Sequence, residues 1–384
     1  MNIVKEFNEI LAFLFFTDEL PDDIPLEEKS RIVRRVLLSS VKLPNLDVQA
    51  LRCVIYKEKK DYLKTTRHHY VLLSSISIKH TDKLTSRRIK NANITFHSKV
   101  SQTFDRSPFS HRISLLGRDK IEDQFASVFV KIQARTPAEA VDLGLYALDL
   151  LRGCWNLYFN YKWVMKQSMG MIQPVNIIKI GRIHTVHEPN GKCAGEVFWY
   201  EPDFTVPIKV DDHYQEWDKV CKFEKWIRKN LKNNPYRTWL EDSIVRYCKA
   251  LDEKMFENTF LKLWSLLERL TGTLKMSYAI TIKRTVFRYS DRQRAEMELE
   301  HLREQRNRTA HHTNGKATPE GITETIVYQL KKYVENHFLF LIKWLRTFDS
   351  FEEYWNFLEQ PTDKNALRKR ILLAKRALKM IEGN

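Results

Sequence analysis

Alternating hydrophobic and polar positions mark the first half of the chain. The segments 68–79, 91–100 and 124–135 are rich in β-branched and aromatic residues with partial alternation, which is typical of strands that bury one face. Two further strands are expected at about 175–186 and 195–201, on either side of the turn sequence HEPNGKC. The first half therefore predicts a β-sheet.

A helix is expected directly after the third of these strands. Thr136 is a suitable N-cap, Pro137 suits the first helical position, and Glu139 favours the positive end of the helix dipole. The residues that follow, AEAVDLGLYALDLLRGCWNLYF, repeat their apolar positions with the period of a helix. The chain also starts with an amphipathic pattern, MNIVKEFNEILAFLFF, whose charged residues and lack of a cleavage site argue against a signal peptide.

From about residue 213 onward the pattern changes to long segments with a helical period and little Gly or Pro. The expected helices are 213–232, 236–256, 257–271, 275–289, 291–309, 319–347, 350–359 and 363–381. Gly272 is expected to end the third helix, Ser290 or Asp291 to cap the fifth, and Thr318 with Pro319 to begin the sixth.

These patterns predict an α+β fold class with two domains. Residues 1–212 form a mixed α/β domain, to which we assign a sensor or regulatory role of unknown kind. Residues 213–384 form an all-helical bundle.

The charge of the chain favours a polyanionic partner. Lys plus Arg number 64 and Asp plus Glu number 48, so the formal net charge is +16 at pH 7, and such an excess attracts nucleic acid through counterion release. The alternative is a basic surface that only solvates the protein. The five cysteines are scattered without a CxxC pair, so no disulfide framework or zinc site is predicted and a cytoplasmic location is expected. No segment reaches the roughly 20 apolar residues that span a bilayer, and no membrane partner is expected.

One short run combines the residue types that cleave RNA. The segment RNRTAHH carries Arg306, Asn307 and His311 where a long helix is expected to end. Metal-free cleavage needs a base near the 2′-hydroxyl, an acid for the 5′-oxygen and positive charge beside the phosphate. An imidazole serves as acid or base near neutral pH, and a guanidinium holds phosphate through two hydrogen bonds. We therefore expect His311 to exchange the proton, Arg306 to neutralise the phosphate and Asn307 to orient them.

Spacing alone does not single out this run. Arg106 and His111 in RSPFSH have the same separation of five, as do Arg182 and His187 in RIHTVH. Pro108 prevents a continuous helix through the first, and the second lies in an expected strand. Only RNRTAHH has Asn after the Arg and closes a long helix before a polar loop.

In this context the C-terminal region resembles a HEPN domain, an all-helical RNA-cleaving module. The resemblance rests on the helical bundle, on the apolar helix FLKLWSLLERLTG with Glu268, and on the later helix that ends in the RNxxxH pattern. It implies a metal-independent endoribonuclease without a cofactor, in which Glu268 pairs with the active-site Arg306. It also implies a homodimer whose two RNxxxH segments form one cleft. Such proteins usually act as toxins or in abortive anti-phage defence, which implies a phage-derived or antitoxin trigger.

Helix geometry is compatible with a site shared by two chains. Residues five apart in an ideal helix point about 140° away from each other, whereas residues four apart nearly align, so Asn307 lies under His311 and Arg308 under His312. For Arg306 and His311 to meet one phosphate, either the helix ends before His311 or two copies face each other. His312 is interpreted as a bystander that could replace His311.

Non-catalytic interpretations remain open at this point. Arg306 and Arg308 near a helix C-terminus complement the helix dipole, His311 can cap carbonyls there, and Glu268 can be a solvated residue. The second hypothesis is accordingly a catalytically silent HEPN protein that binds nucleic acid or acts as a scaffold. A third makes the chain an antitoxin-like or nucleotidyltransferase partner.

The last expected helix, DKNALRKRILLAKRALKMIEGN, sets basic residues around an apolar stripe. It can bind the RNA backbone, pack on the bundle with a solvated basic face, or touch a membrane surface. The candidate RNA contacts outside the catalytic residues are Arg303, Arg308, His312, Arg368, Lys369 and Arg370. The run YKWVMK at 161–166 can stack bases, although the edge of a core helix explains it as well.

Other motifs give no further chemistry. His184 and His187 would face opposite sides of a strand, and adjacent His68 and His69 do the same, so lone histidines are expected rather than a metal site. The sequence contains no P-loop, dinucleotide-binding, GxSxG or HExxH motif. Nucleotide-driven and serine hydrolase chemistry therefore has no support.

Overall fold

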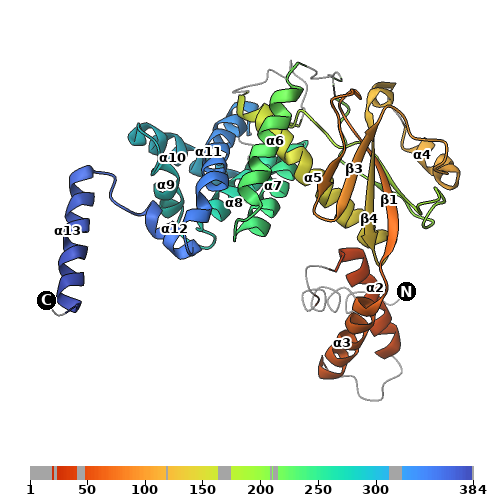
Figure 1. Ribbon diagram of the computed structural model, residues 1–384, viewed down its shortest axis with the longest axis horizontal. Helices are drawn as coiled ribbons and strands as arrows, with labels where there is room; N and C mark the ends of the chain where they lie inside the picture. The colour runs from red at the N-terminus through yellow and green to blue at the C-terminus, as the bar shows by residue number, and fades with distance from the viewer. Residues whose placement is uncertain are drawn as a thin grey trace. The chain divides into compact units, whose positions relative to one another are not determined.

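The computed structural model describes residues 20, 24–40, 48–117, 120–162, 174–207, 210, 215–310 and 322–382. The chain divides into two compact units (Figure 1). The first contains Met1–Leu148 and Ile180–Tyr214, and the second contains Asp149–Lys179 and Gln215–Asn384. This division differs from the predicted single boundary after residue 212, because residues 149–179 belong with the helical unit.

The first unit is built on an antiparallel sheet, which in the described residues has six strands in the order β2-β3-β4-β1-β5-β6. The strands are β1 His68–Ile76, β2 Arg87–Ile89, β3 Ala92–His97, β4 Ala126–Ala134, β5 Ile183–His187 and β6 Trp199–Tyr200. The predicted strands at 68–79, 91–100 and 124–135 are confirmed. The strand predicted at 175–186 begins only at Ile183, and the short strand β2 was not predicted.

The two faces of this sheet bury different residues. On one face, Val71, Leu73 and Phe129 form a cluster on which Val100 and Phe104 pack. On the other, Leu72 lies against Gly144 of helix α5 (Pro137–Lys162). A Cβ at Gly144 would lie 2.6 Å from Cδ2 of Leu72, so the absence of a side chain lets the helix approach the strand.

Two longer helices and several short ones complete the first unit. They are α2 Leu26–Ser40, α3 Val48–Lys64, the 3-10 turns η1 Ser107–Phe109 and η2 Lys120–Gln124, and α4 Ser110–Leu115. The helices α2 and α3 pack on each other through apolar residues such as Ile32, Val36 and Ile55. The amphipathic helix expected for the first residues lies outside the described part of the chain.

The helix α5 starts as its sequence predicts. The backbone N–H of Glu139 donates to the Thr136 hydroxyl at 3.2 Å, so Thr136 is the N-cap. Its first half, to Leu148, belongs to the first unit and its second half to the second.

The second unit is helical throughout its described secondary structure. Its helices are the second half of α5, α6 Trp217–Leu231, α7 Arg237–Asp252, α8 Phe256–Thr271, α9 Tyr278–Val286, α10 Arg292–Ala310, α11 Glu324–Trp344, the 3-10 turn η3 Leu345–Thr347, α12 Phe351–Leu358 and α13 Lys364–Ile381. The helix α8 is central, since it packs against α7, α9, α10 and α11. An α+β fold with a helical second unit is therefore confirmed.

Local signals set several of these helix ends. Gly272 ends α8 with a φ of 65°, a left-handed conformation that glycine adopts without strain. The Asp291 side chain accepts from the backbone N–H of Arg294 at 3.1 Å and caps α10. The start predicted at Thr318 and Pro319 lies outside the described residues, and α11 begins after Thr323, which accepts from the N–H of Ile326.

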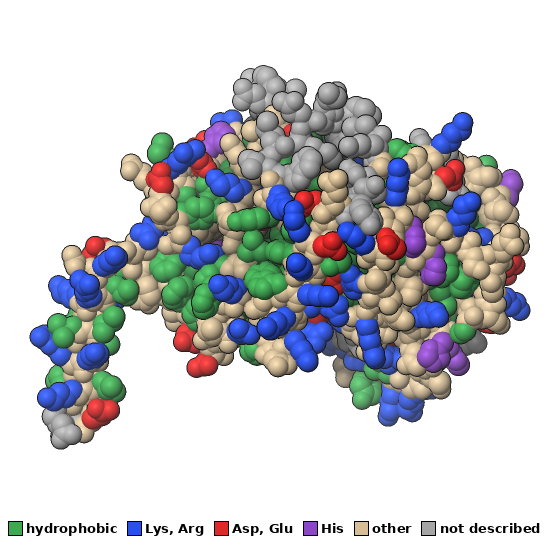
Figure 2. Space-filling model, turned by 45° about the horizontal axis from the view of Figure 1, so that its top comes forward, with side chains coloured by type: hydrophobic (Ala, Val, Ile, Leu, Met, Phe, Trp, Pro, Cys, Tyr) green, Lys and Arg blue, Asp and Glu red, His purple; other side chains and the backbone are tan. Residues whose placement is uncertain are grey.

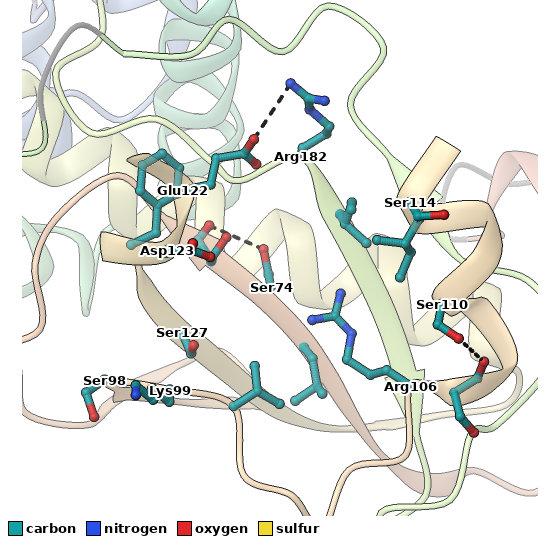
Figure 3. A pocket seen from close by; sticks show the side chains of 17 residues that line it. Ser74, Ser98, Lys99, Arg106, Ser110, Ser114, Glu122, Asp123, Ser127 and Arg182 are labelled. Carbon is teal, nitrogen blue, oxygen red and sulfur yellow. Dashed lines mark hydrogen bonds and ion pairs between the residues drawn. The ribbon is translucent and has the colours of Figure 1, made fainter. Parts of the chain in front are cut away.

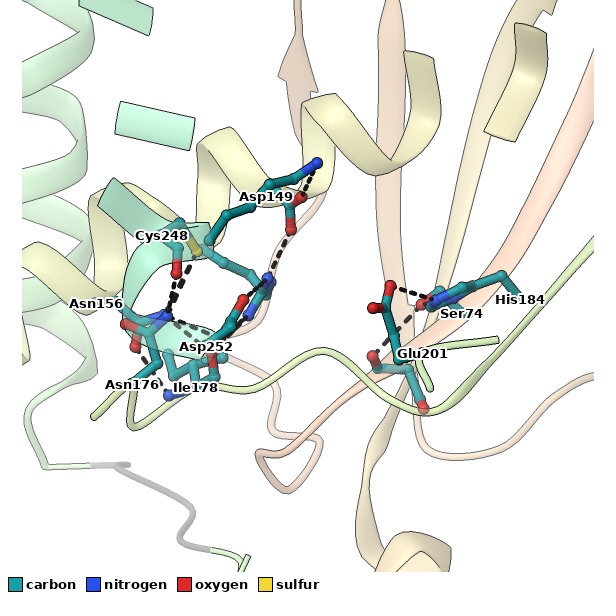
Figure 4. Close-up of polar contacts among 12 residues, drawn as sticks. Ser74, Asp149, Asn156, Asn176, Ile178, His184, Glu201, Cys248 and Asp252 are labelled. Carbon is teal, nitrogen blue, oxygen red and sulfur yellow. Dashed lines mark hydrogen bonds and ion pairs between the residues drawn. The ribbon is translucent and has the colours of Figure 1, made fainter. Parts of the chain in front are cut away.

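A buried ionic network explains why residues 149–179 belong to the helical unit (Figure 4). Arg152 donates to Asp149 at 2.6 Å and to Asp252 at the end of α7 at 2.8 Å, although its own side chain is only 1% exposed. Asn176 donates to the Cys248 carbonyl at 2.7 Å and to Asp252 at 2.8 Å. These charge-assisted bonds fasten the segment to α7.

Among the described residues, no helix is long and apolar enough to cross a membrane.

Candidate functional site

The candidate site lies where α8, α9 and α10 meet. Leu299 and Leu302 are fully buried and Gln305 is nearly so, and they fix α10 in its contacts with the other two helices. This arrangement places the next residue, Arg306, with its Cζ atom 4.9 Å from the centre of the Tyr278 ring at the start of α9. Arg306 as a residue is partly exposed. It therefore stacks on an aromatic face and can still contact a ligand.

Glu268 of α8 lies on the same side of the helical unit. Trp264, one turn earlier and 1% exposed, donates its indole N–H to Oε1 of Glu268 at 2.9 Å. Burial raises the pKa of Glu268, while the Trp264 hydrogen bond and the charge of Arg306 act to lower it. Glu268 and Arg306, which are 38 positions apart, therefore interact electrostatically in the fold.

Aromatic contacts tie these groups together. The rings of Trp264 and Tyr278 meet edge to face with centroids 5.9 Å apart. Trp264 therefore holds Glu268 through its N–H and Tyr278 through its ring, and Tyr278 in turn supports Arg306. We call Trp264, Glu268, Tyr278 and Arg306 the Arg306 cluster. Tyr278 and Trp264 were not predicted from the sequence, because no pattern links them to Arg306.

The other residues of the RNRTAHH run are placed only in part. Asn307 is partly exposed, Arg308 is exposed, and α10 remains helical through Ala310. His311 and His312 lie outside the described residues. In the structure the charge of Arg306 acts on Glu268, and the candidate histidine lies outside the described residues.

The additional RNA-binding candidates have local contacts. Arg303 pairs with Glu300 on its own helix at 2.9 Å. Arg368 and Lys369 are exposed on α13, where Arg370 donates to Oε1 of Gln360 at 3.2 Å. Of the YKWVMK run, only residues 161 and 162 are described, and Tyr161 is 51% exposed.

In the first unit a hydroxyl, an imidazole and a carboxylate are linked by hydrogen bonds (Figure 4). Oγ of Ser74 lies 2.9 Å from Nδ1 of His184, and Nε2 of His184 lies 3.3 Å from Glu201. Ser74 is 6% exposed and His184 only 1%, and Ser74 also lines a pocket of this unit (Figure 3). His184 is a core histidine with both nitrogens hydrogen-bonded. As predicted, His187 faces the other side of β5, where it contacts Thr185 and the Gly191 carbonyl.

The first unit also contains a pocket of about 940 Å³ (Figure 3). Its walls carry serine hydroxyls from the sheet and from α4, among them Ser75, Ser110 and Ser127. Arg182 lies beside Glu122 in an ion pair of 3.7 Å and donates to the Leu116 carbonyl at 2.6 Å. With hydroxyls and charges of both signs, the pocket can hold a small polar molecule. Sequence reasoning missed it, because its serines come from separate segments.

A second buried polar group lies in the helical unit. Lys331 and Glu335 of α11 pair at 3.0 Å, and both are at most 3% exposed. Lys331 also donates to the Asn160 carbonyl at 2.6 Å, and the Tyr247 hydroxyl donates to Glu335 at 2.5 Å. Burial raises the pKa of Glu335 and lowers that of Lys331. Two opposite charges four apart in an apolar helix are the sequence signal that could have indicated this pair.

The part of the chain that the structure describes contains no group of three or more His, Cys, Asp or Glu side chains that could hold a metal ion. Comparisons with models of protein families, with curated proteins and with solved structures returned no match for this chain.

Proposed function

We propose that this protein is a metal-independent endoribonuclease whose site is built around Arg306, Asn307 and His311. The observation that carries the proposal is the Arg306 cluster. Arg306, a partly exposed residue near the end of a long helix, stacks on the ring of Tyr278, and its charge acts on the Glu268 carboxylate of another helix. Such support keeps a guanidinium oriented for two parallel hydrogen bonds to a phosphate.

The proposed reaction uses the RNA's own hydroxyl. The 2′-oxygen attacks the phosphorus and the bond from phosphorus to the 5′-oxygen breaks, which leaves a 2′,3′-cyclic phosphate and a 5′-hydroxyl. His311 takes the 2′-proton or gives one to the 5′-oxygen. Arg306 stabilises the negative charge that builds on the phosphate, and Asn307 orients the reacting groups. Two copies of the chain would supply the groups for one cleft.

Biologically, we assign the activity to a toxin or an abortive anti-phage effector. The first unit would then sense the trigger or restrain the nuclease. Its hydroxyl-rich pocket is the feature that supports a sensing role. Arg303 and Arg308 would contact the RNA backbone outside the reacting groups.

The test compares each candidate with a residue of the same type that lies in α10. Arg306→Ala is paired with Arg294→Ala, whose side chain is 76% exposed, and His311→Ala is paired with the exposed His301→Ala. Cleavage of total RNA is measured in EDTA. We expect the two site variants to lose about 100-fold or more in rate and the two controls to keep wild-type activity. An RNA whose scissile nucleotide lacks the 2′-hydroxyl should resist the wild-type protein.

Two results would refute the proposal. Equal activity of all five proteins would remove Arg306 and His311 from the site. Activity that disappears only when EDTA is added would remove the metal-free mechanism.

One observation favours a second candidate, a catalytically silent nucleic-acid-binding or scaffold protein. The contact of Arg306 with Tyr278 and its electrostatic interaction with Glu268 would also suit a purely structural link between helices. In that case the wild-type protein binds RNA without cutting it, and Arg306→Ala lowers the unfolding temperature. Gel-shift and thermal unfolding measurements on the same variants separate the two functions.

A further inference from the structure

The helix α13 exposes large apolar side chains as well as basic ones. Of its side chains only Ala366 is partly covered, and the rest are exposed. Its large apolar residues range in exposure from 38% at Leu367 to 83% at Ile381. Figure 2 shows hydrophobic and basic side chains together on the surface of this helix. The sequence left open that α13 packs on the bundle, and in the described residues it does not.

The helix has local reasons to form without such packing. The Asp363 side chain accepts from the backbone N–H of Ala366 at 2.8 Å and caps its first turn. The 18 residues that follow are mostly Ala, Leu, Lys and Arg, which are strong helix formers. The exposed apolar side chains are therefore held in fixed directions along the helix.

Those directions divide the helix into two halves. With about 100° between successive residues, one half carries three alanines and all but one of the large apolar side chains. These are Leu367, Ile371, Leu373, Leu378, Met380 and Ile381. Arg370 is the one cation on this half, and it donates to Gln360.

The other half is basic. It carries six of the seven Lys and Arg residues of the helix together with Asn365, and its one large apolar residue is Leu372. The segment Lys364–Ile381 contains no Asp or Glu. An apolar half facing a basic half is the pattern of a helix that lies in a membrane interface.

The charge and the amphipathic pattern of α13 together indicate which kind of partner it binds. A second copy of α13 would cover the apolar half but would bring Arg370, the one cation of that half, against an equally basic helix. RNA would neutralise the cations but would leave the apolar half in water. A bilayer with anionic lipids meets both requirements, because its acyl region takes the apolar side chains and its headgroups attract the cations.

We propose that α13 binds the surface of a membrane that contains anionic lipids. The helix lies in the plane of the interface with its apolar half, which includes Ile371 and Leu378, toward the acyl chains. This inference replaces the expectation of no membrane partner, and it does not depend on the proposed ribonuclease activity.

The test uses the full chain and two neighbouring residues as a matched pair. Ile371 and Leu372 are both 50% exposed and lie on opposite halves of the helix. Ile371→Glu and Leu372→Glu therefore change the net charge equally and remove similar side chains, and neither disturbs a core. Co-sedimentation is measured with vesicles that mix phosphatidylserine with phosphatidylcholine and with vesicles of phosphatidylcholine alone.

We expect the wild-type protein to bind the mixed vesicles, to bind the neutral vesicles at least tenfold more weakly, and to be released by high salt. Ile371→Glu should weaken binding to the mixed vesicles at least tenfold. Leu372→Glu should weaken it by only about fivefold, the change expected from one altered charge near an anionic surface.

Other outcomes overturn the inference. An equal loss in the two variants would show attraction by charge alone, and tighter binding to a single-stranded RNA than to the mixed vesicles, with the same equal loss, would assign the helix to RNA. A vesicle-free change in oligomeric state caused by Ile371→Glu would assign the apolar half to a second copy. Absence of binding by the wild-type protein would also refute the proposal.

Discussion

Tyr278 provides a direct test of how Arg306 is held. Replacement by leucine removes the ring that lies 4.9 Å from the guanidinium, whereas Tyr278→Phe keeps a ring and removes only the hydroxyl. A cation–π contact between partly exposed groups contributes about 1 kcal/mol. The edge-to-face contact with Trp264 contributes about another 1 kcal/mol.

These contributions predict the size of the effect. Tyr278→Leu should lower the free energy of unfolding by about 2 kcal/mol, and Tyr278→Phe should leave it nearly unchanged. If Arg306 is catalytic, Tyr278→Leu should also slow RNA cleavage about fivefold, since a loss of 1 kcal/mol in orienting the guanidinium corresponds to that factor.

The assay is a double-mutant cycle measured by urea unfolding. It comprises the wild type, Tyr278→Leu, Arg306→Ala and the double variant. The coupling energy should be about 1 kcal/mol, the share of the cation–π contact. A coupling energy near zero, or equal destabilisation by Tyr278→Leu and Tyr278→Phe, would refute the assignment of Tyr278 as the support of Arg306.

Two further predictions concern the buried polar groups of the helical unit. Burial, with Arg288 nearby, lowers the pKa of His337 from 6.5 to about 3. The unfolded chain therefore binds a proton that the folded chain does not, and stability present above pH 6.5 is lost as the pH falls toward 3. In urea titrations over this pH range, the free energy of unfolding should fall by about 1.4 kcal/mol more per pH unit for the wild type than for His337→Gln. Equal slopes for the two proteins would contradict the shift in the pKa of His337. Arg152→Ala should cost about 3–5 kcal/mol by removing the short ion pairs of the buried Asp149 and of Asp252, whereas Lys249→Ala, whose side chain is 62% exposed, should cost at most about 1 kcal/mol. Similar losses in the two variants would show that the buried network does not stabilise the fold.

Most of the secondary structure could be predicted from the sequence, because its causes are local. The cap at Thr136, the left-handed Gly272 and the cap at Asp291 act within one turn of the chain. The strands β1, β3 and β4 follow from alternating apolar residues. The late start of β5 could not be predicted, because the apolar residues before it belong to the segment that Arg152 and Asn176 fasten to α7.

The candidate site divides in the same way. The sequence indicated Arg306 through the RNxxxH pattern at the end of its helix, and Glu268 as an acidic residue in an otherwise apolar helix. It did not indicate Tyr278 or Trp264, because an aromatic residue in a helix is usually part of a core. The contact of Trp264 with Glu268 is local to α8, whereas the contacts of Tyr278 with Trp264 and Arg306 arise only when α8, α9 and α10 pack together.

By itself, the sequence determined the α+β fold, the order and approximate bounds of the main elements, and the amphipathic pattern of the last helix. Only the tertiary structure decided which helices surround Arg306, which unit takes residues 149–179, and that the apolar half of α13 is exposed. The physical reason is the range of the interactions. Periodicity and capping act over a few neighbouring residues, whereas burial and ion pairing depend on partners that lie tens or hundreds of positions away, such as Asp252 for Arg152.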